Sequence, residues 1–348
     1  MNSNIAHRRL HNQHLASAAF EHPGDVVRWF GALQAQDYHG ALWAVGLRMQ
    51  HAVEADIEQA MADGTIIRTH PMRGTWHFVA PEDIRWLLTL MAPGRIASEA
   101  YYYRQLELDD ATFARSNAVF ARTLQGGKQL TRRELAAALV QAGISPAGLR
   151  LTFLLSRAEI EGVIASGARR GKQFTYALLD ELVPTSRMLT RDESLAELAR
   201  CYFTSHGPAT VQDFAWWSGL PASDARAGLE MVKSHFIQEE IDGRTYWLSP
   251  STPTTIASPT AYLLPAFDEY TVAYQNRGAI LDPAHTQHTS HGLAPTIIVD
   301  GHIVGTWKRT IKKDSTTITT TLLTPLTESQ NQALATALER YNKFAKQE

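Results

Sequence analysis

The chain has 348 residues, 44% hydrophobic and 20% charged, a composition typical of a globular protein that excludes wholesale disorder. Its 33 Lys and Arg residues nearly balance 35 Asp and Glu residues, so any nucleic-acid-binding surface must be local. No apolar run predicts a membrane span, the N-terminus lacks a signal-peptide core, and the single Cys201 excludes an intrachain disulfide, so we expect a cytoplasmic protein.

In chain order, the sequence predicts a run of helices and then a hairpin, three times. Apolar residues recur at helical spacing from Pro23, from Thr131 to Gly143, and over 148–160, 193–204, 209–220 and 221–236. Strand-forming residues flank turns with Gly or Pro in 64–79, 162–179 and 236–248. Helices closed by a hairpin are the winged-helix plan, so we expect units over 1–120, 121–190 and 191–255.

The amino-acid composition changes after the third hairpin. A Pro/Ser/Thr-rich linker at 251–260 leads into β-rich runs, which predict a small barrel or curved sheet over 256–325. Apolar residues at helical spacing predict a terminal helix within 326–348. The predicted fold class is therefore α+β and helix-rich, with three tandem winged-helix units, a C-terminal β-barrel and a terminal helix.

Two glutamines, Gln34 and Gln36, lie between apolar runs at the expected end of the first helix. Two amides that converge on a cavity can hold one water through their carbonyl oxygens, but an amide is a very poor base. Such a pair suits a reaction with a good leaving group, in which water meets a cationic transition state. From spacing alone, we favour the alternative that both amides cap or bridge helices. Asp37 and His39 would support this pair from a second layer.

Further candidates lie in the first hairpin, where Arg73 would meet phosphate. Strand alternation places His77 opposite Trp76, so His77 is expected to face a cleft while Trp76 packs into its own core. Asp268 and Glu269 form a tight carboxylate pair in an apolar context, and Asp268 would hold a cationic base or an Arg, or form a salt bridge with Arg277.

Basic clusters are the remaining candidates for phosphate contact, and a solvated surface is the alternative for each. They are Arg8 and Arg9, Arg169, Arg170 and Lys172, and Lys308 and Arg309. His7, His11 and His14 recur at helical spacing beside Arg8 and Arg9, and a phosphate-facing helix is favoured there over a metal site.

Five segments carry a resemblance to a known family. They are LQAQDYHGALWAVGLR, IIRTHPMRGTWHFVAPEDIRWLL, HGPATVQDFAWWSGL, LLPAFDEYTVAYQNR and VDGHIVGTWKR. In this order they resemble the AlkZ/YcaQ-like winged-helix proteins, which include bacterial DNA glycosylases that act on alkylated bases and interstrand crosslinks. The resemblance runs from about residue 5 to residue 345. It implies three winged helices, a β-barrel, and a Gln-x-Gln motif in which Gln34 and Gln36 position the attacking water, with no cofactor or metal.

We therefore expect a monomeric DNA glycosylase that hydrolyses the N-glycosidic bond of alkylated, cationic purines in double-stranded DNA, with crosslinks as further substrates. The first alternative is a non-enzymatic DNA-binding protein, either a regulator or a damage-protection protein. A binding module for a small toxin or metabolite is the second alternative.

Overall fold

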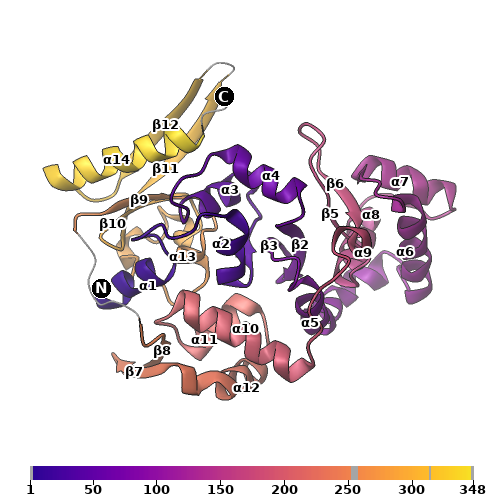
Figure 1. Ribbon diagram of the computed structural model, residues 1–348, viewed down its shortest axis with the longest axis horizontal. Coiled ribbons are helices and arrows are strands. Elements are labelled where there is room, and N and C mark those ends of the chain that lie inside the picture. The colour runs from indigo at the N-terminus through magenta and orange to yellow at the C-terminus, as the bar shows by residue number, and fades with distance from the viewer. Residues whose placement is uncertain (1–2, 252–257, 313–314, 346–348) are drawn as a thin grey trace. The chain divides into compact units, whose positions relative to one another are not determined.

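The computed structural model describes residues 3–251, 258–312 and 315–345 (Figure 1). Residues 252–257 of the predicted linker and the last residues of the predicted terminal helix lie outside this description. The chain divides into two compact units. Unit 1 comprises Met1–Glu58 and Ala196–Glu348, and unit 2, Gln59–Leu195, is inserted between them in the sequence. No helix in the described ranges is long and apolar enough to span a membrane.

Unit 1 begins with short helices around the Gln34 segment. They are α1 (Ser3–Asn12), α2 (Pro23–Phe30) and α3 (Tyr38–Gly46), with the two-residue strand β1 (Leu33–Gln34) between α2 and α3. Pro23 suits the first turn of α2, because a proline there loses no helical hydrogen bond. Gly31 ends the helix at a φ of 73°, which a glycine adopts without strain. Helix α4 (Glu54–Ala62) crosses from unit 1 into unit 2.

The third predicted run of helices ends in a hairpin within unit 1. Helix α10 (Arg191–His206) enters the unit and is followed by α11 (Val211–Ser218), α12 (Ala222–Val232), β7 (Ile237–Ile241) and β8 (Arg244–Leu248). Thr210 and Asp213 form a capping box that starts α11. Asp242 and Gly243, both at positive φ, make the tight turn between β7 and β8.

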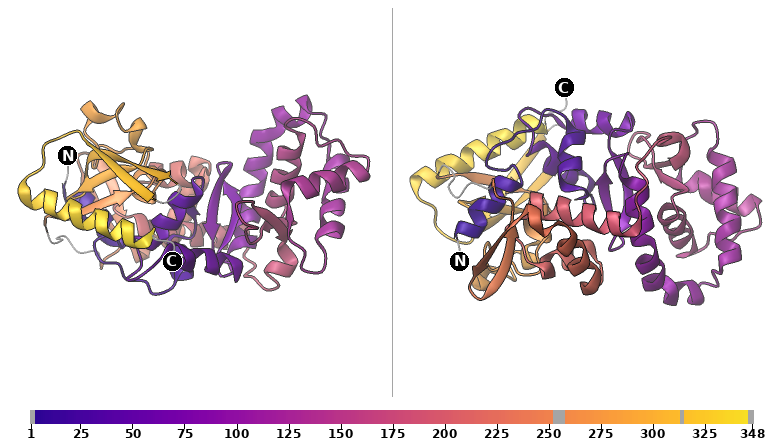
Figure 2. Two further views of the ribbon diagram at one scale, coloured as in Figure 1. Left: turned by 90° about the horizontal axis from the view of Figure 1, so that it is seen from above. Right: turned by 60° about the horizontal axis from the view of Figure 1, so that its bottom comes forward.

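The C-terminal part of unit 1 is an antiparallel sheet covered by a helix (Figure 2). Its strands are β9 (Ala261–Leu264), β10 (Thr296–Val299), β11 (His302–Lys312) and β12 (Ser315–Leu322), in the order β12-β11-β10-β9. Helix α14 (Glu328–Phe344) packs against β9, and Tyr341 and Phe344 contact Trp43 of α3.

The predicted closed barrel is not found among the described residues, where these four strands form an open sheet. The segment between β9 and β10 adds no strand that could close it. There Asp268 caps the amide of Tyr270 and starts the short helix α13 (Glu269–Val272), and the 3-10 turns Pro283–His285 and Ser290–Gly292 follow. A local cap therefore overrides the β-branched and aromatic composition of this segment.

Unit 2 contains the first two hairpins. Strands β2 (Ile67–Met72) and β3 (Thr75–Val79) are followed by α5 (Ile84–Gln105) and α6 (Asp110–Leu124). The first hairpin turns at Arg73 and Gly74, and a register shift between Thr69 and Met72 accommodates Pro71 within β2.

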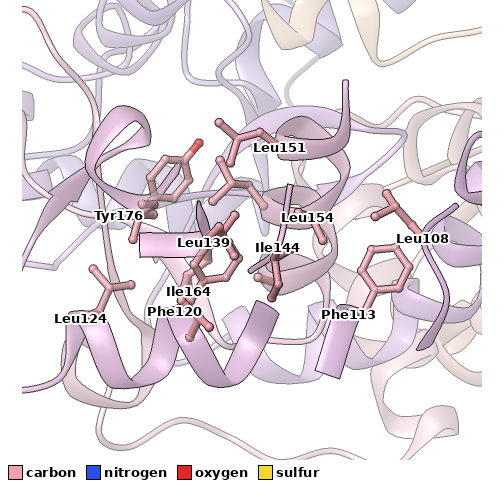
Figure 3. Close-up of a cluster of buried hydrophobic side chains, with 14 of the residues drawn as sticks. Leu108, Phe113, Phe120, Leu124, Leu139, Ile144, Leu151, Leu154, Ile164 and Tyr176 are labelled. Carbon is pink, nitrogen blue, oxygen red and sulfur yellow. The ribbon is translucent and has the colours of Figure 1, made fainter. Parts of the chain in front are cut away.

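The second half of unit 2 carries its own sheet and core. Its elements are β4 (Leu130–Thr131), α7 (Arg132–Gln141), α8 (Arg150–Ile160), β5 (Ile164–Ser166), β6 (Thr175–Leu178) and α9 (Leu179–Leu182), with sheet order β4-β6-β5. Thr131 and Glu134 form a capping box that starts α7, where the sequence predicted a helix from Thr131. Figure 3 shows the core between α6, α7, α8 and the strands β5 and β6, where Phe120, Leu139 and Leu154 are fully buried.

Candidate active site

Gln34 and Gln36 lie in the connection between α2 and α3. Gln34 ends β1 and is 9% exposed, whereas Gln36 is exposed to solvent. Asp37 precedes the first residue of α3 and is also exposed. One glutamine of the motif is therefore buried, and the other is exposed.

A buried carboxylate, Glu269 of α13, anchors the backbone of Gln34. Glu269 is 1% exposed, and its Oε1 accepts a hydrogen bond from the Gln34 backbone N–H at 2.7 Å. Its Oε2 accepts from Trp217 Nε1 at 2.8 Å and lies 3.2 Å from His206 Nε2. Hydrogen bonds to a charged acceptor are about twice as strong as neutral ones. Residues from α10, α11 and α13 thus fix the strand that carries the motif.

His206 completes this network from the C-terminal end of α10. Its ring is buried, and burial lowers its pKa, although the neighbouring Glu269 opposes the shift. Its Nε2 lies 3.2 Å from Glu269, and its Nδ1 lies 2.8 Å from the Ser205 hydroxyl, which donates to the Cys201 carbonyl at 2.7 Å. These contacts tie Glu269, and through it the backbone of Gln34, to α10.

Asp268 holds an arginine, as one of the sequence interpretations proposed, but the partner is Arg48 rather than Arg277. Both carboxylate oxygens of Asp268 lie 2.9 Å from Arg48 nitrogens, and both side chains are fully buried. Arg48 also donates to the side chain of Gln13 at 3.0 Å. Arg277 instead donates to the Thr271 carbonyl at 2.5 Å. This bidentate ion pair joins the C-terminal end of α3 to the start of α13, beside Glu269.

Unit 1 contains a cavity of about 260 Å³, and four of the candidate site residues from the sequence analysis line it. Asp37, His39, Lys308 and Arg309 line it, with Trp43 and Trp307 among the apolar residues of its wall. The two indoles are held in place because their Nε1 atoms donate to the carbonyls of Leu263 and Leu264, each at 2.7 Å.

Charged groups at the same cavity are linked through one carboxylate. His39 Nδ1 lies 2.8 Å from Glu54, and an Arg309 nitrogen lies 3.7 Å from the same carboxylate. The arrangement is an aromatic cavity with a cationic side, which suits a planar group attached to an anionic backbone.

The expected phosphate contacts of Arg8 and Arg9 are wrong for this structure. Arg9 is 1% exposed, donates to the Pro208 carbonyl at 3.0 Å and lies 3.5 Å over the ring of Tyr274. Arg8 is buried too and contacts Glu239 at 2.6 Å. The two guanidinium groups therefore bind a backbone carbonyl and a carboxylate inside unit 1 rather than phosphate.

Within unit 2, the first hairpin also differs from the expectation. His77 is fully buried, and its Nδ1 contacts the Thr75 carbonyl at 2.9 Å, so it does not face a cleft. Arg73 occupies the turn and lies 3.4 Å from His77 Nε2. Trp76 packs against the core of unit 2, as expected, with the ring of His70 3.6 Å from its own.

The basic wing between β5 and β6 is at the surface, as predicted. Arg170 and Lys172 are exposed, and Arg170 contacts Glu134 at 2.9 Å. Arg169 lies 5.5 Å from the ring of Phe174. No group of three or more His, Cys, Asp or Glu side chains forms a metal site within the described residues.

A family model for AlkZ-like DNA glycosylases matches residues 27–344, which include both glutamines and Glu269. The chain belongs to the AlkZ-like DNA glycosylase family. The predicted resemblance is confirmed, and so is the prediction of an enzyme of the DNA N-glycosylase class.

A sequence comparison and a structure comparison agree with the family match. The interstrand DNA cross-link repair glycosylase of Streptomyces sahachiroi is 24% identical over 324 residues, which cover 86% of this chain and 85% of the relative. The solved structure of the Streptomyces sahachiroi DNA glycosylase AlkZ superposes with a TM-score of 0.82 at 21% identity, covering 99% of this chain and 97% of the other. The fold is therefore that of AlkZ.

Sequence reasoning missed two side chains of this site, His206 and Trp217. It singled out Glu269 only as the neighbour of Asp268 in a carboxylate pair, not as the anchor of Gln34. His206 and Trp217 lie in another of the matching segments, but no local pattern showed that they would meet Glu269.

Proposed function

We propose that this protein hydrolyses the N-glycosidic bond of alkylated, cationic purines in double-stranded DNA, with a water held by Gln34 and Gln36. We also propose that it acts on interstrand crosslinks, as the name of the Streptomyces sahachiroi relative says of that protein. Alkylation gives the base a positive charge and makes it a good leaving group, so no strong base is needed to activate the water.

The observation that carries the proposal is the anchoring of Gln34 by Glu269. A water-holding group lowers a barrier most when it is fixed before the reaction begins. The buried carboxylate fixes the backbone of Gln34, and Gln36 follows two residues later at the surface, where DNA can reach it. The negative charge of Glu269 also favours the positive charge that develops on the sugar as the base departs.

The cavity beside the motif supports a DNA substrate. Its volume of about 260 Å³ is lined by Trp43 and Trp307, which suit a planar base, and by Lys308 and Arg309, which suit its phosphate. Asp37 and His39 belong to the same cavity and act as supporting groups. We also propose further phosphate contacts in unit 2, made by Arg73, Arg169, Arg170 and Lys172.

We further propose that the three runs of helices and hairpins are winged-helix modules that recognise DNA by shape rather than by sequence. The helix before each hairpin would be the base-reading helix in a sequence-specific regulator. However, α8 is buried or half-buried at every position except Thr152, and α4 carries Asp56 and no Lys or Arg. These two helices fit a repair enzyme better than a regulator, whereas α12 carries the exposed Arg226.

The test is base release from duplex DNA that carries a single N7-methylguanine, and from a duplex with one N7–N7 crosslink. Free base and abasic sites are measured under single-turnover conditions. We expect Gln36→Ala to lower the release rate by roughly 10²-fold, the effect of losing one preorganised polar group at a reacting centre. Because Gln36 is exposed, the melting temperature should not change.

Gln50→Ala is the matched control, because Gln50 is another exposed glutamine of unit 1. It should retain the wild-type rate. No release of either lesion by the wild-type protein would overturn the proposed reaction. An equal rate per folded molecule in Gln36→Ala and wild type would overturn the role of the motif.

A further inference from the structure

Unit 2 contains a second cavity, of about 580 Å³, whose lining is strongly cationic. It lies between the start of α7, the wing between β5 and β6, and the β2–β3 hairpin. The charged residues of its wall are Arg68, Arg132, Arg133, Arg170 and Lys172, against a single carboxylate, Glu134. The wall therefore carries a net charge of about +4 in a chain whose formal net charge is −2. Such a concentration of one sign creates a local field that attracts anions.

Arg68 is the most deeply placed of these cations. It is 4% exposed, and its guanidinium lies 4.0 Å from the ring centroid of Trp76 and 4.8 Å from that of Phe174. Contact with two aromatic rings offsets part of the cost of burying a charge and holds the group in one orientation. A guanidinium that is fixed before binding loses little conformational entropy when it meets an anion.

Glu134 does not neutralise the rest of the wall. It is occupied by Arg170, at 2.9 Å, and by the backbone and hydroxyl of Thr131 in the capping box. Arg132 and Arg133 are the first two residues of α7 and are exposed. The N-terminal end of a helix adds a favourable potential for an anion at the same place.

The chemistry of the wall selects a phosphate rather than a neutral ligand. Tyr176 lines the same cavity, and burial raises the pKa of its hydroxyl, so it remains a neutral hydrogen-bond donor at physiological pH. Guanidinium groups match the oxygen geometry of a phosphate in a bidentate manner. The volume exceeds what one phosphate needs, which leaves room for the sugar attached to it.

We propose that this cavity is a phosphate-binding pocket of unit 2 that holds the backbone of a DNA strand, with Arg68, Arg132 and Arg133 as its principal cations. The pocket is separate from the Gln34 and Gln36 site of unit 1 and contributes affinity without reading base sequence. The inference rests on the proposed function only in taking DNA as the ligand.

The experiment measures binding of the full chain to an undamaged 20-base-pair duplex between 50 and 200 mM salt. The variant Arg132→Ala/Arg133→Ala changes exposed residues and leaves the buried Arg68 in place. Each lost phosphate contact reduces the slope of log K against log salt by about 0.9, so we expect a slope shallower by about 1.8 and a Kd raised roughly tenfold at low salt. An unchanged slope in a folded variant would overturn the pocket.

Arg115→Ala/Arg122→Ala is the control, because both residues are exposed arginines on α6 of the same unit. It removes the same total charge and should keep the wild-type slope. An equal reduction of the slope in this control would show that overall charge, not the pocket, binds the duplex, and would overturn the proposal. Titration with inorganic phosphate distinguishes the source of the anion. Saturable phosphate binding that is lost in the Arg132→Ala/Arg133→Ala variant, with no change in duplex binding, would overturn the DNA ligand.

Undamaged duplex also separates this inference from the proposed reaction. A protein that releases no base but loses salt-dependent affinity in the Arg132→Ala/Arg133→Ala variant supports the pocket and contradicts the reaction. A protein that releases base normally, with the same slope in variant and wild type, supports the reaction and contradicts the pocket.

Discussion

Replacing Glu269 with Gln should loosen the strand that carries Gln34. The carboxylate accepts from the Gln34 backbone through one oxygen and from Trp217 and His206 through the other. A Gln side chain has one acceptor oxygen, so if it faces Trp217 and His206, its NH₂ group meets the N–H of Gln34. A buried donor left unsatisfied costs about 1–3 kcal/mol, and the two remaining bonds each lose about 1 kcal/mol of charge assistance. The total is about 3–5 kcal/mol.

For a unit of roughly 200 residues this loss corresponds to a fall of about 10 °C in Tm. Base release per folded molecule should also fall at least tenfold, because small displacements of a positioned group cost large factors in rate. Calorimetry and single-turnover release, normalised to the folded fraction, measure the two effects. Glu240→Gln, at an exposed position of β7, is the control. A Tm within about 2 °C of wild type, with a wild-type release rate, would refute the anchoring role.

Two further predictions concern stability. Gln34→Ala should lower the free energy of unfolding in urea by about 1–3 kcal/mol, because its amide is buried, whereas Gln36→Ala should change it by less than about 0.5 kcal/mol; equal losses would contradict the difference in burial. Burial, with a nearby histidine and arginine, lowers the pKa of His14 from 6.5 to about 4, so the folded state favours the neutral form of His14. The stability that this preference contributes is full above pH 6.5 and is lost as the pH falls to 4. His14→Phe keeps the contacts with Phe20 and Trp29 and should reduce the fall in unfolding free energy between pH 6.5 and 4, and an unchanged pH profile would count against this assignment.

The helices and hairpins could be predicted because their signals are local. The capping box of Thr131 and Glu134 begins α7 where the sequence indicated, and the residues Asp242 and Gly243 turn the third hairpin. The barrel could not be predicted correctly, since whether a sheet closes depends on how many strands pair. The segment at Tyr270 has strand-like composition, but the Asp268 cap directs it into a helix.

The candidate site was predictable in its glutamines but not in its support. Gln34 and Gln36 stand out because two polar residues interrupt apolar runs. The bond from Gln34 to Glu269 joins residues 235 positions apart, and no periodicity reports such a contact. Arg9 shows the converse error, because a pair of arginines has the same sequence pattern whether it meets phosphate or Tyr274. Burial, which decides between these, arises from tertiary packing.

The insertion of unit 2 within unit 1 has a consequence for the order of synthesis. Gln34 leaves the ribosome 235 residues before Glu269, an interval of roughly 10 to 50 seconds at ordinary elongation rates. Throughout that interval Gln59–Leu195 can complete its own core, while the glutamine motif has no carboxylate to fix it. A chain released before Glu269 is translated would therefore lack this anchor for Gln34, and under the proposed mechanism interrupted translation would yield fragments that release no base.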